Sequence, residues 1–193
     1  MSYPKREEAQ SLLREAENCN PGPWGNHSRV AAYCAEIIAA AAGLNPDKAY
    51  VLGLLHDIGR KFGVTHMAHV RDGYRYMTEL GYDEVARVCL THSFSLHTTD
   101  VFVGNRDIPE EDEKTLSRLL AKTEYDEYDR LIQLCDCLAG AEGIVDMEER
   151  MDDVRRRYGF YPEKKRQSYR DLRRYFEEKC GCGIYELLGR YEP

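Results

Sequence analysis

Histidine and aspartate side chains that could bind a metal ion occur at several points along the chain. The 193 residues include only six histidines, and four of them fall at or near the ends of predicted helices: His27, His56, His69 and His92. Asp57 follows His56 directly, after the apolar string LGLL. An ionised carboxylate at the end of a buried helix has a high desolvation cost unless a cation or a partner compensates. The adjacent pair therefore predicts a metal site.

Three segments place these residue types in a recognisable order. NHSRVAAYCAEI contains a histidine, VLGLLHDIGR contains the His-Asp pair, and LIQLCDCLAG contains a late aspartate. In these segments, over residues 26–142, the chain resembles the HD superfamily of metal-dependent phosphohydrolases. The string LLHDIGR in a helical context is the most specific element of the resemblance. The motif order is closest to that of the bacterial HD hydrolases that split diadenosine tetraphosphate symmetrically.

The resemblance implies a first metal ion held by four residues: His27, His56, Asp57 and Asp136. Two imidazoles and two carboxylates form a mixed nitrogen and oxygen set that suits Fe, Mn, Co, Ni or Zn and suits Ca poorly. The set does not distinguish among these five transition metals.

Some branches of the superfamily bind a second ion. The chain offers His69, which matches a His-x3-Gly pattern with Gly73, and His92, with Asp57 bridging the two ions. His66 lies one turn before His69 and competes with it as a ligand. We expect two ions. The alternative is one ion, with His69 and His92 donating hydrogen bonds to the phosphate or to the residues that bind that ion.

The resemblance implies hydrolysis of a nucleotide or another small phosphate ester through a metal-activated water. We expect Asp57, Arg60 and Lys61 to act in catalysis, the two cations by contacting phosphate. Two other hypotheses stay open. One is a di-iron HD oxygenase, because the same ligands serve both chemistries, and the other is a non-catalytic nucleotide-binding regulatory module.

The charge of the chain limits the kinds of molecule that it can bind. The net charge of −7 and the pI near 5.4 argue against bulk nucleic-acid binding but allow a small anionic substrate at a metal site.

No apolar run is long enough for a membrane span. The first residues lack a signal-peptide pattern and the seven cysteines are an odd number, so we expect a cytoplasmic protein. The Cys135-x-Cys137 and Cys180-x-Cys182 pairs are too closely spaced for a common zinc motif. The oligomeric state, including a homodimer, stays open.

Helical periodicity runs through almost the whole chain, which predicts an all-α fold, an HD-domain helical bundle with a C-terminal helical extension. We expect one domain over 1–193, with 143–193 packed on the core. The expected helices cover 4–18, 26–42, 46–57, 66–80, 83–92, 110–121, 126–143, 145–158, 163–179 and 183–190. The polar stretch 93–109 is predicted to be a loop bordering the substrate cleft, with Phe94 and Phe102 as stacking faces for a base.

Overall fold

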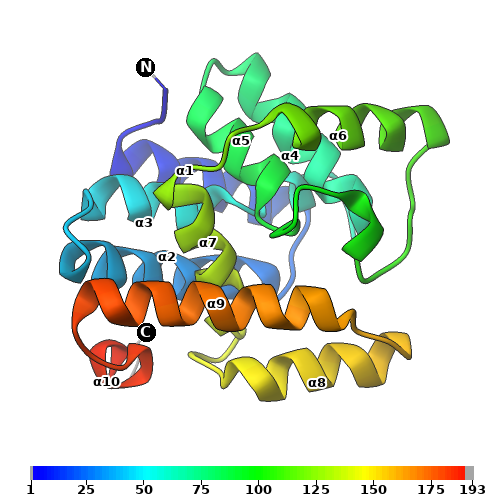
Figure 1. The fold of residues 1–193 in the computed structure, drawn as a ribbon. Coiled ribbons are helices and arrows are strands. Elements are labelled where there is room, and N and C mark those ends of the chain that lie inside the picture. Colours follow the sequence, from blue (N-terminus) through cyan, green and yellow to red (C-terminus); the bar gives the residue numbers. More distant parts are fainter. Residues whose placement is uncertain (1, 190–193) are drawn as a thin grey trace.

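The computed structural model describes residues 2–189, which form ten α-helices and two short 3-10 helices (Figure 1). The α-helices are α1 Arg6–Cys19, α2 Trp24–Ala41, α3 Pro46–Leu55, α4 Met67–Glu79, α5 Asp83–Thr91, α6 Glu110–Lys122, α7 Glu127–Leu138, α8 Met147–Tyr158, α9 Glu163–Cys180 and α10 Ile184–Leu188, and the 3-10 helices are η1 Ile58–Phe62 and η2 Thr99–Val101. Within these residues there is no strand, and the all-α prediction is confirmed. None of the described helices has the length and apolar character needed to cross a membrane. Residue 190, the end of the last expected helix, lies outside the described part.

Helices α2 and α3 form the centre of the main core. They approach at Gly53, where an added Cβ would lie 2.9 Å from the Cα of Ala32, so a larger side chain would force the two helices apart. α7 packs on both helices, and α9 lies along α2 and α7 (Figure 1). Met151 of α8 and Phe176 of α9 are buried in the same core, so the C-terminal helices share it.

A second hydrophobic cluster lies among α4, α5 and α6. Its buried members are Met67, Val70, Leu90, Phe94, Phe102, Leu116 and Leu120. Phe94 is fully buried in this cluster, so its ring offers no face to a ligand and the stacking expectation for it is wrong. Its burial fixes the start of the 93–109 loop directly after α5.

The predicted helix 126–143 ends early, at Leu138. Ala139 has extended backbone angles, and Val145 donates to the carbonyl of Leu138, which turns the chain back on itself. An isolated bridge joins Ala139 to Ile144. The end of α7 matters for the site because it leaves the carbonyl oxygen of Ala139 available to a side chain.

Candidate metal centre and cavity

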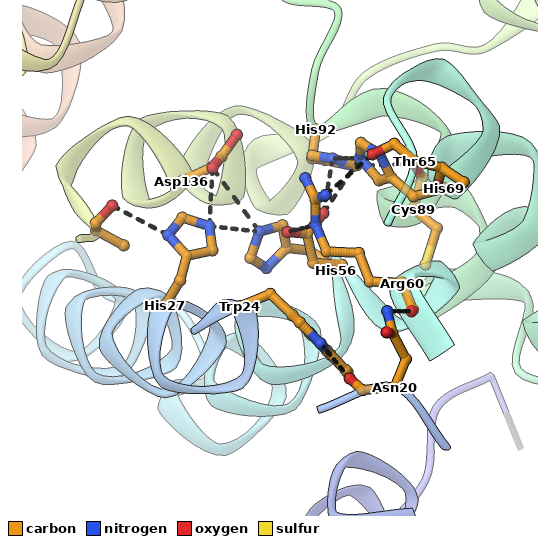
Figure 2. Close-up of polar contacts among 12 residues, drawn as sticks. Asn20, Trp24, His27, His56, Arg60, Thr65, His69, Cys89, His92 and Asp136 are labelled. Carbon is orange, nitrogen blue, oxygen red and sulfur yellow. Dashed lines mark hydrogen bonds and ion pairs between the residues drawn. The ribbon is translucent and has the colours of Figure 1, made fainter. Parts of the chain in front are cut away.

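Five separate elements bring the predicted ligands together (Figure 2). His27 comes from the first turn of α2, His56 and Asp57 from the junction of α3 and η1, and the remaining three from α4, α5 and α7: His69, His92 and Asp136. The four histidines and Asp57 are buried. The loop before His27 is fixed by two hydrogen bonds, from Trp24 Nε1 to the carbonyl of Asn20 and from Asn20 Nδ2 to the carbonyl of Arg60.

Backbone carbonyls orient three of the four imidazoles. His27 Nδ1 lies 3.0 Å from the oxygen of Ala139, and His56 Nδ1 lies 2.7 Å from that of Gly53. His92 Nδ1 is 2.9 Å from the oxygen of Cys89. A carbonyl oxygen only accepts hydrogen bonds, so Nδ1 carries the hydrogen in each ring. With Nδ1 as the donor, it is Nε2 that each ring can offer to a metal ion.

The Nε2 atoms meet in two pairs. His27 Nε2 lies 3.3 Å from His56 Nε2, and His69 Nε2 lies 3.2 Å from His92 Nε2. Asp57 belongs to both neighbourhoods: its carboxylate forms one potential ligand group with His27 and His56 and another with His69 and His92. Two groups that share one carboxylate could hold two ions.

The two carboxylates complete the donor set. Asp136 Oδ1 lies 3.1 Å from His27 Nε2 and 3.8 Å from His56 Nε2. Asp57 Oδ1 is 3.2 Å from His69 Nε2, and it is a buried oxygen that accepts no hydrogen bond. A buried, unsatisfied carboxylate oxygen surrounded by imidazole lone pairs is costly unless a cation binds it. The residues present therefore fit a transition-metal ion.

The protonation states also suit metal binding. Burial lowers the pKa of His56 to about 4 and holds that of His69 well below its usual range, so both rings stay neutral at neutral pH. Burial alone would raise the pKa of Asp57, but Arg60 and the surrounding imidazoles outweigh it and bring the pKa well below the ordinary value. Burial likewise opposes ionisation of Asp136, yet its contact with His27 leaves a lowered pKa.

Two glycines allow α4 to approach the His-Asp pair. A Cβ on Gly59 would lie 2.0 Å from the carbonyl oxygen of His69 and 2.5 Å from the amide nitrogen of Gly73. Only a residue without a side chain permits this backbone contact. A Cβ on Gly73 would meet Cys89 of α5 at 3.2 Å. The spacing between His69 and Gly73 therefore has a packing reason: it brings His69 within reach of Asp57.

A buried polar network holds the end of α5, where His92 lies. Thr91 Oγ1 donates to Asp129 Oδ1 at 2.7 Å, and Gln133 Nε2 donates to the carbonyl of Thr91 at 3.0 Å. Asp129 and Gln133 both belong to α7. These bonds fix the position of α5 relative to the helix that carries Asp136.

A cavity of about 410 Å³ opens above the metal centre. Its polar wall contains Arg60, Arg150 and Arg157, and its apolar lining includes Trp24, Val64, Phe102, Val103 and Val154. Ser93, Phe102 and Val103 belong to the 93–109 loop, so the prediction that this loop borders the cleft is confirmed. A floor of potential metal ligands, a cationic wall and apolar surfaces suit a small phosphate ester with an organic part.

The structure separates the two predicted cations. Arg60 lines the cavity, with its Nε 2.5 Å from Asp57 Oδ2. Lys61 is directed away from the cavity: its Nζ donates to Glu15 Oε1 at 2.7 Å and to the hydroxyl of Tyr76 at 3.2 Å. The geometry does not bring Lys61 to the site. His66 lines the cavity and contacts the hydroxyl of Tyr158, but it belongs to neither ligand group.

Sequence reasoning missed the residues that α8 and α9 contribute to the cavity walls. Arg150, Arg157 and Tyr158 come from α8, and Lys165 of α9 lines an adjoining space. The sequence contains one indication that Lys165 faces inward. Tyr169, Leu172 and Phe176 form an apolar stripe at helical spacing, and Lys165 occupies the next position of that stripe. A lysine on the buried face of a helix requires an explanation.

Comparison with known proteins agrees with this geometry. The model of the HD domain family matches residues 24–141. The chain therefore belongs to the HD domain family. No curated protein sequence matches it.

Two of the similar solved structures are of the HD domain of the phosphodiesterase PgpH from L. monocytogenes. The structure in complex with cyclic-di-AMP is 19% identical, with a TM-score of 0.51, and the match covers 95% of this chain and 100% of that one. A second structure of the domain is 18% identical, with a TM-score of 0.49, and covers 83% and 94%. At this identity the first match shows a shared fold, and it reaches the C-terminal helices beyond the family match. The finer resemblance to diadenosine tetraphosphate hydrolases stays a prediction.

Proposed function

We propose that the protein is a metal-dependent phosphohydrolase acting on a nucleotide or another small phosphate ester. One observation carries the proposal: four imidazoles and two carboxylates cluster together, and all of them except the buried His56 line a cavity whose wall contains arginines. Membership of the HD domain family supports it. The PgpH domain of similar fold is named as a phosphodiesterase, and it binds cyclic-di-AMP, a small phosphate-containing nucleotide. We further propose that residues 1–193 act as one domain.

In this proposal His27, His56, Asp57 and Asp136 would hold one metal ion, and His69 and His92 would hold a second, with Asp57 as a ligand that both groups share. Such ions supply Lewis acidity, which lowers the pKa of water and neutralises charge on phosphoryl oxygens. The chain's own residues do the positioning. Arg60 lies at the cavity wall beside Asp57, where a guanidinium can donate to a phosphoryl oxygen, and Trp24 and Phe102 provide apolar contact for the organic part.

The test is metal analysis of protein purified without chelator, followed by chromatographic detection of hydrolysis products from a nucleotide panel with Mn, Fe, Co, Ni and Zn. The variant His56→Asn should lose bound metal and activity. The matched control is His97→Asn, because His97 stacks on Tyr125 and does not line the cavity. Wild-type metal content in His56→Asn would refute the ligand assignment. Bound metal without hydrolysis of any nucleotide in the panel would favour the regulatory module, and a mixed-valent di-iron signal with cleavage of a carbon skeleton would favour the oxygenase.

A further inference from the structure

A smaller cavity adjoins the metal-binding cavity on the side of α8 and α9. Its volume is about 120 Å³, several times what one water molecule requires. The two cavities have five lining residues in common: Ser93, Val103, Asp136, Arg150 and Val154. The smaller one is also lined by Lys165 and by Tyr161 and Tyr169. A group bound in it would therefore lie next to a group bound at the metal centre, with Asp136 at the boundary.

Lys165 is an unusual residue in this position. It is only 6% exposed, and its Nζ donates to the carbonyl oxygen of Ser93 at 3.0 Å. Burial lowers the pKa of its ammonium to about 8, and the nearest carboxylate to counteract this, Asp136, is a predicted metal ligand. Lys165 forms no ion pair with any residue in the range 2–189. A buried ammonium with a carbonyl oxygen as its one hydrogen-bond partner retains unused donors.

Arg150 provides a second cation to the same cavity. Its side chain is half-buried, and its guanidinium makes no hydrogen bond or ion pair with another described residue. Two nearby arginines do have carboxylate partners. Arg157 Nε donates to Asp153 Oδ2 at 2.9 Å, and Arg166 donates to Glu148 at 2.6 Å. Three carboxylates of α8, those of Glu148, Asp152 and Asp153, thus pair with arginines other than Arg150.

The helix dipoles do not favour the positions of Arg150 and Lys165. Arg150 lies in the first turn of α8, and Lys165 lies in the first turn of α9. The N-terminal end of a helix carries a partial positive charge, so a cation in the first turn is disfavoured there. Both positions instead favour a bound anion, which would accept from the side chains and benefit from the local field.

We propose that Lys165 and Arg150 bind a second phosphoryl group of the substrate, adjacent to the phosphate that lies at the metal centre. This inference rests on the proposed phosphohydrolase function and specifies its substrate class: a nucleotide with two or more linked phosphates. Lys165 is a specificity-determining residue in this assignment. Its bond to Ser93, the residue after His92, also fixes the subsite relative to the metal centre.

The test compares the binding of α,β-methylene-ADP and AMP to the metal-loaded protein by calorimetry. Wild-type protein should bind the diphosphate at least about tenfold more tightly, the range expected for charged hydrogen bonds. Lys165→Met keeps the length of the buried stem and removes the charge, and it should reduce the ratio to about threefold or less. Arg150→Gln should act in the same direction. Matched controls are Lys164→Met and Arg156→Gln, on exposed positions of the same helices, which should retain the wild-type ratio.

The ratio of the two affinities separates recognition from a purely structural role. If Lys165 had only a structural role, Lys165→Met would lower stability or weaken the binding of both nucleotides equally. Circular dichroism with thermal melting measures the change in stability. If Lys165→Met does not fold, Arg150→Gln decides alone, because its side chain is only half-buried. A full preference for the diphosphate in both variants, or none in wild type, overturns the subsite.

This outcome is independent of the hydrolase test. A preference that depends on Lys165 in a protein that hydrolyses nothing would leave the subsite intact and refute the proposed function. Hydrolysis of nucleotides without a preference for the diphosphate would support the proposed function and refute the subsite.

Discussion

Asp57 and Arg60 form an ion pair inside the metal centre, with 2.5 Å between Asp57 Oδ2 and Arg60 Nε. Arg60 therefore holds one oxygen of the carboxylate, while the other oxygen faces His69 and accepts no hydrogen bond. Arg60 also donates to the carbonyl of Thr65 at 3.2 Å, which fixes the guanidinium from both sides. Through this pair Arg60 controls the charge and the orientation of Asp57.

Replacing Arg60 with Gln should weaken metal binding, and more so in acid. Without the guanidinium only the imidazoles oppose the effect of burial, so the pKa of Asp57 rises and protons compete with the metal in acid. We expect the loss of Mn affinity to be larger near pH 5 than near pH 8, because a carboxyl whose pKa rises by roughly one to three units takes up protons first in acid. Calorimetry at both pH values measures this. Lys61→Gln is the control, since Lys61 contacts Glu15 and Tyr76, and equal losses at the two pH values in Arg60→Gln would contradict the account.

The second ligand group predicts a change in metal stoichiometry. His69→Asn and His92→Asn should each lower the metal content from two ions per chain toward one, because both rings direct Nε2 to the same place as Asp57 Oδ1. Elemental analysis of metal-saturated, desalted protein gives the number. His97→Asn should keep two ions. A wild-type protein that saturates at one ion per chain would show that the two-ion proposal is wrong.

Gly59→Ala should disturb the metal centre without changing a ligand. The added methyl would overlap the carbonyl of His69, a backbone atom that cannot move without shifting α4. We expect a loss of about 1–3 kcal/mol in the free energy of unfolding, as for an overpacked core, together with weaker binding of the second ion. Urea unfolding and metal titration measure the two effects. Gly183→Ala is the matched control because an added Cβ there meets nothing within 4 Å, and an unchanged second site in Gly59→Ala would contradict the packing argument.

The helices could be predicted from local patterns in the sequence, and the residues proposed as ligands, which a motif singles out, lie close together in the structure. The apolar string before His56 and the periodicity of its neighbours are visible in a short window, and the order of His27, the His-Asp pair and Asp136 is a motif. The helix ends were predicted less well. Nothing local indicated that α7 ends at Leu138, because the bond between Val145 and Leu138 depends on a turn further along the chain.

Side-chain direction could not be predicted from position in the sequence. Arg60 and Lys61 are adjacent, yet the 3-10 turn of η1 directs one to Asp57 and the other to Glu15 of α1. The contributions of Arg150 and Lys165 depend on how α8 and α9 pack on the bundle. The many charged residues of these helices concealed two cations that face inward.

The stability of the metal-free protein should fall as the pH decreases from about 7 to about 5. His56 has a pKa of about 4 in the folded protein against 6.5 as the ordinary value, because burial disfavours the charged ring. Between these two values the unfolded chain binds a proton that the folded protein does not, so acid favours unfolding. His69, whose pKa is also lowered by burial, acts in the same direction. Each histidine contributes at most about 1.4 kcal/mol per pH unit.

Urea unfolding in the presence of EDTA, at intervals across this pH range, measures the dependence. The variant His56→Asn should show a shallower loss of stability with decreasing pH than wild type, because the proton uptake of one buried imidazole is removed. Carboxylates titrate in both proteins, so their contribution cancels in the comparison. His97→Asn should follow the wild-type curve, since its ring stacks on Tyr125 away from the cluster. Parallel curves for wild type and His56→Asn would show that His56 is not held in its neutral form by burial, and the lone pair proposed to bind the metal would lose that support.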